Sequence, residues 1–281
     1  MTSFKIKSHA KLNLALNVTG KSSKLHKIES IISFIDLHDL IYLKETSKKK
    51  HQIYFKGKFS KNIGKINTVT MLLKLLDEKK YLGGRKFKIK IIKNIPQKSG
   101  MGGGSINAAS LIKFFIAKKI LKINRIELIS LTKKIGSDVI LGLNQTNSIL
   151  STNGKIKNYD SKLKFYTLVV KPNFGCSTEY IYSKVKKFTK SKFDFPKKSM
   201  FNTNYLENLN NDLEKIAIKK YPKLETIKSF LMTTTNTTFV RMTGSGSSIV
   251  AYYHSKRSCE IAYRHFRRKY KNHWCIVSKT I

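Results

Sequence analysis

The chain has 281 residues, of which 41% are hydrophobic, so it can bury one large core or two moderate ones. It carries 56 Lys and Arg against 16 Asp and Glu, a formal net charge of +40. No apolar run is long enough to cross a bilayer, and Lys5, Lys7 and Lys11 interrupt any signal-peptide core, so neither a membrane protein nor a secreted protein is expected. The three cysteines form no CxxC pair, which disfavours zinc and a disulfide framework and favours a cytoplasmic location.

The positive charge admits two interpretations. A protein this basic could bind nucleic acid or an anionic membrane surface. The lysines, however, are spread along the chain, their longest pure run is Lys48–Lys50, and no aromatic-and-basic RNA-binding signature is present. An AT-rich genome also encodes many Lys, Ile and Asn residues at surface positions that tolerate substitution. We therefore expect no specific nucleic-acid partner and no membrane partner, with a charge that attracts anionic small molecules.

The first half of the chain is predicted to contain both helices and strands. Val69, Leu72, Leu73 and Leu76 are spaced three or four residues apart, which predicts a helix over 68–77. A second short helix is predicted over 126–135. Alternation of apolar and polar residues predicts strands over 4–7, 12–18, 28–35, 40–44, 52–55 and 86–92.

The second half of the chain mixes strands and helices. Residues 148–164 are polar and contain Asn153-Gly154, a turn signal. Strands are predicted over 165–170, 239–242, 249–253 and 274–278, and helices over 178–185, 213–221, 223–231 and 255–270. This order predicts an α+β fold of two lobes with a cleft between them, divided into an N-terminal domain (1–155) and a C-terminal domain (156–281).

A glycine-rich stretch lies between the strand over 86–92 and an apolar helix predicted to begin near Asn107. Residues 95–109 read I-P-Q-K-S-G-M-G-G-G-S-I-N-A-A. Glycines at such a place let the backbone approach a ligand closely and adopt positive φ. The free amide groups and the dipole of a helix start suit a phosphate. The stretch is therefore typical of a loop that binds nucleotide phosphates.

Known phosphate loops differ in the residues that accompany the glycines. The Walker A pattern needs a Lys after the last Gly, and none is present here. The Rossmann pattern fails because Ser105 stands where its third Gly should be. The H-R-D and D-F-G elements of protein kinases are absent. The remaining pattern, P-x-x-x-G-M-G-G-G-S-x-N-A-A, resembles the phosphate loop of the GHMP small-molecule kinases, named after galactose, homoserine, mevalonate and phosphomevalonate.

Four other segments resemble the same family and occur in its order along the chain. The first, A-K-L-N-L at 10–14, is followed by V-T-G at 18–20 and by His26. The others are G-S-D-V at 136–139, N-D-L-E at 211–214 and R-M-T-G-S-G-S at 241–247. The resemblance covers nearly the whole chain. It implies a kinase that uses ATP and Mg²⁺ to phosphorylate an alcohol group of a small molecule.

The resemblance also implies roles for particular residues. Asp138 would act as the general base that takes the proton from the alcohol. Lys11, a buried cation, would keep that base ionised and stabilise negative charge in the transition state. Ser105 would face Mg²⁺ and the phosphates. The residues implied to bind the nucleotide are Asn67, Lys93, Pro96, Gly100, Gly102, Gly103, Gly104, Ser105 and Asn107.

Two of these nucleotide-binding assignments have a structural alternative. Asn67 precedes the helix over 68–77 and could serve as its N-cap. Asn107 could serve the local turn instead of the ligand.

The residues expected to bind the alcohol substrate are those at which the chain departs from the family pattern. His26 resembles the histidine that contacts cytosine in the family member acting on a cytidyl-linked alcohol of non-mevalonate isoprenoid synthesis. The Tyr that precedes that histidine in the pattern is Leu25 here, which removes one face of a ring sandwich and leaves Tyr182 as the other. The residues implied to bind this substrate are Asn13, His26, Thr178, Tyr182, Gly244, Ser245 and Gly246.

Two other functions stay open at this point. The chain could be a different GHMP kinase acting on homoserine or mevalonate, although His26 favours the cytidyl substrate. It could also be a non-catalytic nucleic-acid binder on a decayed kinase scaffold, because the usual D-V-P-F-F reads D-V-I-L-G at 138–142. Retention of Lys11, Asp138 and the glycine loop favours a working kinase, which is expected to be a monomer or homodimer.

Overall fold

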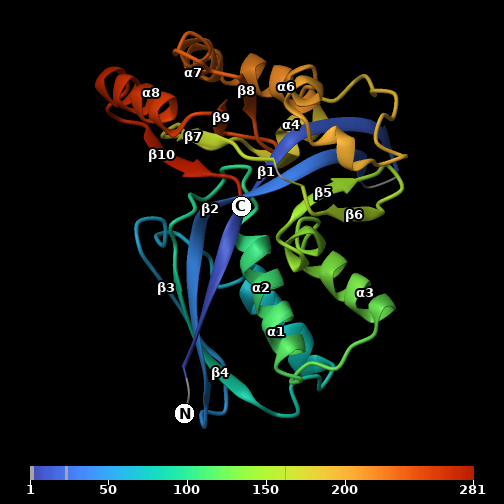
Figure 1. Ribbon diagram of the computed structural model, residues 1–281. Coiled ribbons are helices and arrows are strands. Elements are labelled where there is room, and N and C mark those ends of the chain that lie inside the picture. The colour runs from blue at the N-terminus through green and yellow to red at the C-terminus, as the bar shows by residue number, and fades with distance from the viewer. Residues whose placement is uncertain (1–2, 23–24, 162) are drawn as a thin grey trace. The chain divides into compact units, whose positions relative to one another are not determined.

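The protein forms two compact units that interleave along the sequence in the computed structural model, which describes residues 3–22, 25–161 and 163–281. The first unit holds residues up to Ala10, Leu37–Pro96 and Gly102–Gln145, and the second holds Lys11–Asp36, Gln97–Met101 and Thr146–Ile281. The interleaving follows from two long paired strands, β1 (Phe4–Lys21) and β2 (His26–Thr46), because each contributes residues to both units (Figure 1).

The long strands differ from the sequence-based expectation of four short ones. The predicted segments 4–7 and 12–18 both lie in β1, and 28–35 and 40–44 both lie in β2. Polar residues that interrupt the alternation, including Lys11, are buried inside β1 instead of marking its end. The units therefore do not divide at residue 155, and a division into functional domains 1–155 and 156–281 stays a prediction.

The first unit pairs the second half of β2 with β4 (Lys86–Ile92), antiparallel from Leu40 opposite Ile92 to Thr46 opposite Lys86. Strand β3 (Gln52–Lys56) pairs with β4 in parallel. Helices α1 (Thr68–Glu78), α2 (Gly103–Ala117) and α3 (Arg125–Ile135) complete the unit, with the short 3₁₀ helix η1 (Ile140–Leu143).

The core of the first unit lies between the strands and the helices. Phe87 and Ile89 of β4 pack in one buried cluster with Leu72 of α1 and Leu111 and Phe115 of α2. The spacing that predicted α1 is confirmed, because Val69, Leu72, Leu73 and Leu76 are its buried residues. Apolar residues at this spacing form one helix face, and that face is removed from water.

The second unit contains a four-stranded antiparallel sheet built from β7 (Tyr166–Lys171), β8 (Phe239–Met242), β9 (Ile249–Tyr253) and β10 (Trp274–Lys279). The strand order in this sheet is β10-β7-β9-β8. The first half of β2 pairs with β5 (Asn147–Leu150), which forms a hairpin with β6 (Ile156–Tyr159). The turn expected at Asn153-Gly154 lies in this hairpin, where Gly154 has a φ of 80°.

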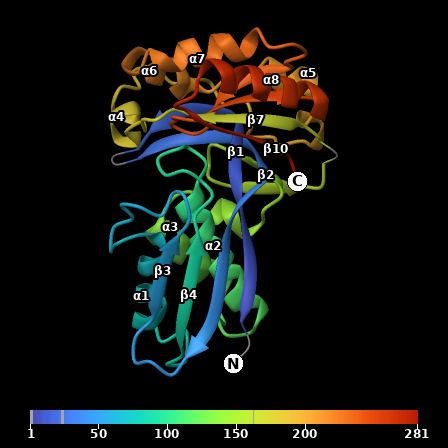
Figure 2. The same cartoon turned by 90° about the vertical axis from the view of Figure 1, so that its left-hand side faces the viewer.

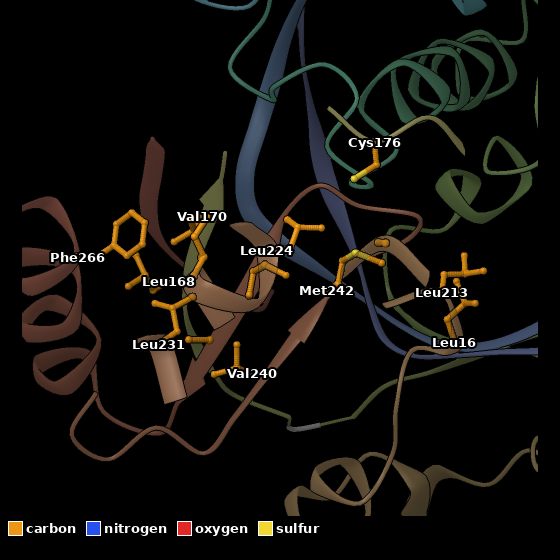
Figure 3. Close-up of a cluster of buried hydrophobic side chains, with 14 of the residues drawn as sticks. Leu16, Leu168, Val170, Cys176, Leu213, Leu224, Leu231, Val240, Met242 and Phe266 are labelled. Atoms are coloured by element: carbon orange, nitrogen blue, oxygen red, sulfur yellow. The ribbon is translucent and has the colours of Figure 1, made fainter. Parts of the chain in front are cut away.

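Two helices, α7 (Lys223–Met232) and α8 (Lys256–Lys269), cover one face of this sheet (Figure 2). Their buried side chains, among them Leu231 and Phe266, pack with Leu168 and Val240 of the sheet (Figure 3). The remaining helices of the unit are α4 (Thr178–Ser183), η2 (Lys198–Met200), α5 (Thr203–Glu207) and α6 (Asp212–Lys220). The mixed α+β architecture predicted from the sequence is confirmed.

Within the described residues, no helix is both long enough and apolar enough to span a bilayer.

Candidate functional site

The glycine loop leads directly into α2 in the first unit. The N-cap of α2 is Gly102, whose φ of 68° is left-handed, and no side chain of the described residues caps the helix. The helix begins at Gly103, earlier than the expected start near Asn107. Because no side chain occupies its first-turn amide groups, they can donate to an anion at the positive end of the helix dipole.

The next two glycines lie close to neighbouring side chains. A Cβ atom on Gly103 would lie 3.0 Å from Cγ2 of Ile95, and one on Gly104 would lie 3.1 Å from the Thr68 hydroxyl. That hydroxyl donates to the Gly104 carbonyl at 2.7 Å. The start of α2 is therefore held against the start of α1.

Asn67 has the structural role left open by the sequence. Its Oδ1 accepts from the amides of Val69 and Thr70, both at 3.1 Å, and so caps α1. Its Nδ2 donates to the Gly64 carbonyl at 3.0 Å. Contact of Asn67 with a nucleotide base stays a prediction.

Asp39 joins three of the segments that surround the loop. Its buried carboxylate pairs with the ammonium group of Lys93 and accepts from the amides of Asn94 (2.8 Å) and Ile95 (2.9 Å). It also accepts from Nδ2 of Asn107 on α2 at 2.9 Å. One carboxylate thus fixes the end of β4, the entry to the glycine loop and the inner face of α2.

This arrangement sets what Lys93 and Asn107 can offer a ligand. The Lys93 ammonium, paired with Asp39, lies 3.4 Å from where a Cβ on Gly103 would be, so it places a further N–H donor beside the helix start. Oδ1 of Asn107 is buried and accepts no hydrogen bond within the described residues. Pro96, which follows Ile95, is buried.

Asp138 lies in the turn between α3 and η1, as expected, and is partly exposed. Two glycines in and after this turn lie close to α2. A Cβ on Gly136 would lie 3.4 Å from the Ser105 hydroxyl, and one on Gly142 would lie 2.8 Å from Ala109. The departure from the family pattern at 140–142 therefore replaces bulk with a glycine that lets η1 approach α2.

In the second unit, the side chain of Asn13 connects strands β1 and β2 with a C-terminal loop. Its Oδ1 accepts from Nζ of Lys11 (2.8 Å) and from the amide of Gly244 (3.0 Å). Its Nδ2 donates to the hydroxyl of Ser30 at 2.8 Å. The backbone amide of Asn13 donates to the hydroxyl of Thr243 at 3.0 Å. Lys11 is 2% exposed, so the buried cation expected from the sequence is present.

The loop over 243–248 packs against the start of the glycine loop, residues 97–101 of the same unit. The amide of Ser248 donates to the Ser99 carbonyl at 3.2 Å. A Cβ on Gly244 would lie 2.8 Å from the Gly100 carbonyl oxygen, and one on Gly100 would overlap the Thr243 carbonyl. Gly100 and Gly244 have φ values of 75° and 56°, so both positions require a residue without a side chain.

Helix α4 brings the remaining substrate residues together. Thr178 and Tyr182 are four positions apart and so share one face of the helix. The hydroxyl of Thr178 lies 2.8 Å from that of Ser245, and the Tyr182 ring centroid lies 5.2 Å from that of His26. Gly246, with a φ of 86°, leaves room for Cys176, whose Sγ would lie 3.1 Å from a Cβ there.

The predicted site residues thus fall into two groups, one in each unit. The first unit holds Asn67, Lys93, Pro96, Gly102, Gly103, Gly104, Ser105, Asn107 and Asp138. The second holds Lys11, Asn13, His26, Gly100, Thr178, Tyr182, Gly244, Ser245 and Gly246.

Asp39 is a residue that the sequence analysis missed. A signal for it exists, because Leu37, Asp39, Ile41 and Leu43 alternate on the buried side of β2. A carboxylate at a core position of a strand must have partners, since an unpaired buried charge is costly. Asp39 could therefore have been identified as the centre of a buried polar network.

The residues present fit a nucleoside triphosphate with its metal ion. Mg²⁺ prefers oxygen ligands, and the Ser105 hydroxyl lies in the first turn of α2, where the amide groups suit phosphates. Ser105 and Asp138 are both partly exposed, and the segments that carry them lie close together at Gly136.

The packing of Gly100 predicts an asymmetric effect of two matched substitutions. Gly84 has nearly the same φ, 78°, but nothing lies within 4 Å of a Cβ placed there. Gly84→Ala should therefore lower the free energy of unfolding by only the left-handed strain, about 1–2 kcal/mol. Gly100→Ala should lower it further, because its methyl group meets the Thr243 carbonyl. Equal losses in urea denaturation would contradict this packing.

The buried pair of Asp39 and Lys93 makes a second prediction. Asp39→Asn leaves an uncompensated buried ammonium group and should lower the free energy of unfolding by about 3–5 kcal/mol. The same change at the exposed Asp160 should stay within about 0.5 kcal/mol of the parent. Adding Lys93→Met to Asp39→Asn should recover part of the loss. If Asp39→Asn and Asp160→Asn unfold alike, Asp39 does not have the role described.

Comparisons with known proteins identify the family to which the chain belongs. The model of the GHMP kinases N terminal domain matches residues 67–152, and that of the GHMP kinases C terminal domain matches residues 198–272. The first match contains the glycine loop and Asp138, and the second contains the loop over 243–248.

Curated relatives match over the whole length of the chain. A protein of Pelagibacter ubique named 4-diphosphocytidyl-2-C-methyl-D-erythritol kinase is 62% identical, with all of both chains covered. A protein of Anaplasma phagocytophilum with the same name is 28% identical, over all of this chain and 95% of the relative.

Solved structures share the fold at low sequence identity. A crystal structure of 4-(cytidine 5'-diphospho)-2C-methyl-D-erythritol kinase superposes with a TM-score of 0.80 at 19% identity, covering 99% of this chain and all of the other. L. major mevalonate kinase in complex with R-mevalonate superposes with a TM-score of 0.71 at 16% identity, over 99% of this chain and 96% of the other. The full-length match at 62% identity decides the relationship within this fold. The chain belongs to the GHMP kinases and, within them, to the 4-diphosphocytidyl-2-C-methyl-D-erythritol kinases.

Proposed function

We propose that the protein transfers the γ-phosphoryl group of ATP to the 2-hydroxyl of 4-diphosphocytidyl-2-C-methyl-D-erythritol, a step in isoprenoid precursor synthesis by the non-mevalonate route. The observation that carries the proposal is the 62% identity over the complete length of a relative bearing that name. The adjacent rings of His26 and Tyr182 support it, because they suit a flat base better than a small aliphatic acid.

The start of α2 is suited to the phosphates of ATP. Its first-turn amides place partial positive charge there, and the Lys93 ammonium, whose charge is balanced by Asp39, adds a charged donor beside them. Ser105 would hold Mg²⁺ together with the phosphates, and the bound ion would offset the charge on the transferred group. Gly102, Gly103 and Gly104 would allow the backbone to approach the phosphate oxygens.

The transfer itself needs a base and a cation. Asp138 would accept the proton of the 2-hydroxyl as its oxygen bonds to the γ-phosphorus and the bond to ADP breaks. Lys11, whose Nζ is held by Asn13, would stabilise the negative charge that develops in the transition state. Asn13 would act as a positioning residue for that ammonium group.

The other functions considered from the sequence are less well supported. A homoserine or mevalonate kinase shares the fold, but the 62% identical relative carries neither name. Both family domains match, and Lys11 and Asp138 are retained, which favours an enzyme over a nucleic-acid binder on a decayed scaffold. We further propose a cytoplasmic enzyme, monomeric or homodimeric, with no specific nucleic-acid partner.

The general-base role of Asp138 predicts a loss of turnover without a loss of nucleotide binding. Asp138→Asn keeps the shape of the side chain but removes its basicity, so kcat should fall by at least about 10²-fold. The KM for ATP should change little. Asp160→Asn serves as the matched control and should retain full turnover in a coupled ADP-release assay. Undiminished turnover of Asp138→Asn would rule out the base assignment.

Lys11 can be tested separately, because its ammonium group is the part with the proposed role. Lys11→Met keeps the buried methylene chain and removes the charge, so kcat should fall by about 10²-fold, as for loss of one transition-state stabiliser. The KM for the cytidyl substrate should change less than kcat. A variant that folds as judged by circular dichroism and turns over at the parental rate would refute this role.

A further inference from the structure

The segment between α4 and η2, residues 184–197, contains no helix or strand, yet it is firmly held within the second unit. The buried carboxylate of Glu29 accepts from the amides of Lys192 (2.8 Å) and Phe193 (3.0 Å) and from the hydroxyl of Ser191 (2.6 Å). The Phe193 side chain is fully buried. Hydrogen bonds to one carboxylate therefore fix the middle of the segment.

A second anchor lies immediately after Phe188. The amide of Thr189 donates to the Val18 carbonyl at 2.8 Å, and its hydroxyl donates to Oδ2 of Asp212 at 2.7 Å. The same carboxylate oxygen accepts from the Val18 amide at 2.8 Å. These bonds tie the backbone beside Phe188 to β1 and to the start of α6.

The Phe188 ring stays exposed although the backbone beside it is anchored. It is 48% exposed, and its centroid lies 6.4 Å from the ring of His26. His26 in turn lies 5.2 Å from Tyr182. Three rings from β2, α4 and the segment over 184–197 therefore gather at one place, while Leu25 next to His26 is 73% exposed and contributes no ring.

The chemistry of His26 indicates what this group of rings would bind. Burial, and then the charge of Lys21, lower the pKa of His26, which keeps the ring neutral at pH 7. A neutral imidazole has one donor and one acceptor. Cytosine presents an amino donor beside ring acceptors, so His26 can meet its edge while aromatic faces meet its plane.

We propose that Phe188 is a binding residue for the cytosine of the substrate and supplies the aromatic face that Leu25 does not. The base stacks on Phe188 and Tyr182 with His26 at its edge. The inference rests on the proposed function, because it assigns a residue to the same substrate. Glu29, Thr189 and Asp212 are positioning residues that hold Phe188 in place.

The segment also provides a matched control. Phe195 lies seven residues after Phe188 and is 84% exposed. Its ring pairs with no other aromatic ring of the described residues. Phe188→Ala and Phe195→Ala remove the same side chain from the same segment. A general effect of losing a surface aromatic ring would be equal in the two variants.

The test measures binding of cytidine 5′-monophosphate to the full-length protein by calorimetry, with ADP at saturating concentration so that the ATP site is filled. Phe188→Ala should raise the Kd about tenfold, the loss expected for one base stack, and Phe195→Ala should leave it unchanged. Phe188→Tyr should keep parental affinity. The KM for ATP should be the same in all variants, because the phosphate loop is not altered.

A rescue separates stacking from a structural role. Leu25→Tyr introduced into Phe188→Ala should restore most of the affinity, since a ring returns beside His26 without repairing the segment. If Phe188→Ala and Phe195→Ala bind alike, or if Leu25→Tyr restores nothing, the inference about Phe188 is wrong and the proposed function is untouched. If the parent protein neither binds cytidine 5′-monophosphate nor turns over the cytidyl substrate, the proposed function fails and Phe188 fails with it.

Discussion

The amide side chain of Asn13 is the interaction on which the second unit's part of the site depends. It links Lys11 on β1, Ser30 on β2 and Gly244 on a loop more than 200 residues away in the sequence. Each of these contacts is buried, where a hydrogen bond is costly to lose. The position of the Lys11 ammonium is therefore determined by the C-terminal loop as well as by its own strand.

The loop that Asn13 holds could pack there only because it is built from small residues. Gly100 and Gly244 approach each other so closely that neither can carry a Cβ. Asn211 strengthens the same loop, since its Nδ2 donates to the carbonyls of Met242 and Gly244, both at 2.8 Å. Motifs far apart in the chain thus share one network, which explains why a glycine-rich loop and an N-D-L-E segment occur together.

The sequence predicted most elements with regular periodicity, including β4 and α1, because one face of each is apolar. It did not predict that β1 and β2 are continuous, since Lys11, Asn13 and Ser30 are polar residues paired inside strands. It placed the site residues by resemblance, and their roles stay predictions. It could not identify Glu29 or Phe188, because their importance comes from hydrogen bonds and ring contacts between residues more than 100 positions apart.

Phosphorylation of a cytidyl-linked alcohol is the activity on which the roles of all these residues depend. The most direct measurement is ADP release by the purified parent protein with ATP and Mg²⁺ and, in separate reactions, 4-diphosphocytidyl-2-C-methyl-D-erythritol, homoserine or mevalonate. We expect turnover of the cytidyl substrate and only background release with the other two. Turnover of homoserine or mevalonate in its place, or background release with all three, would contradict this activity.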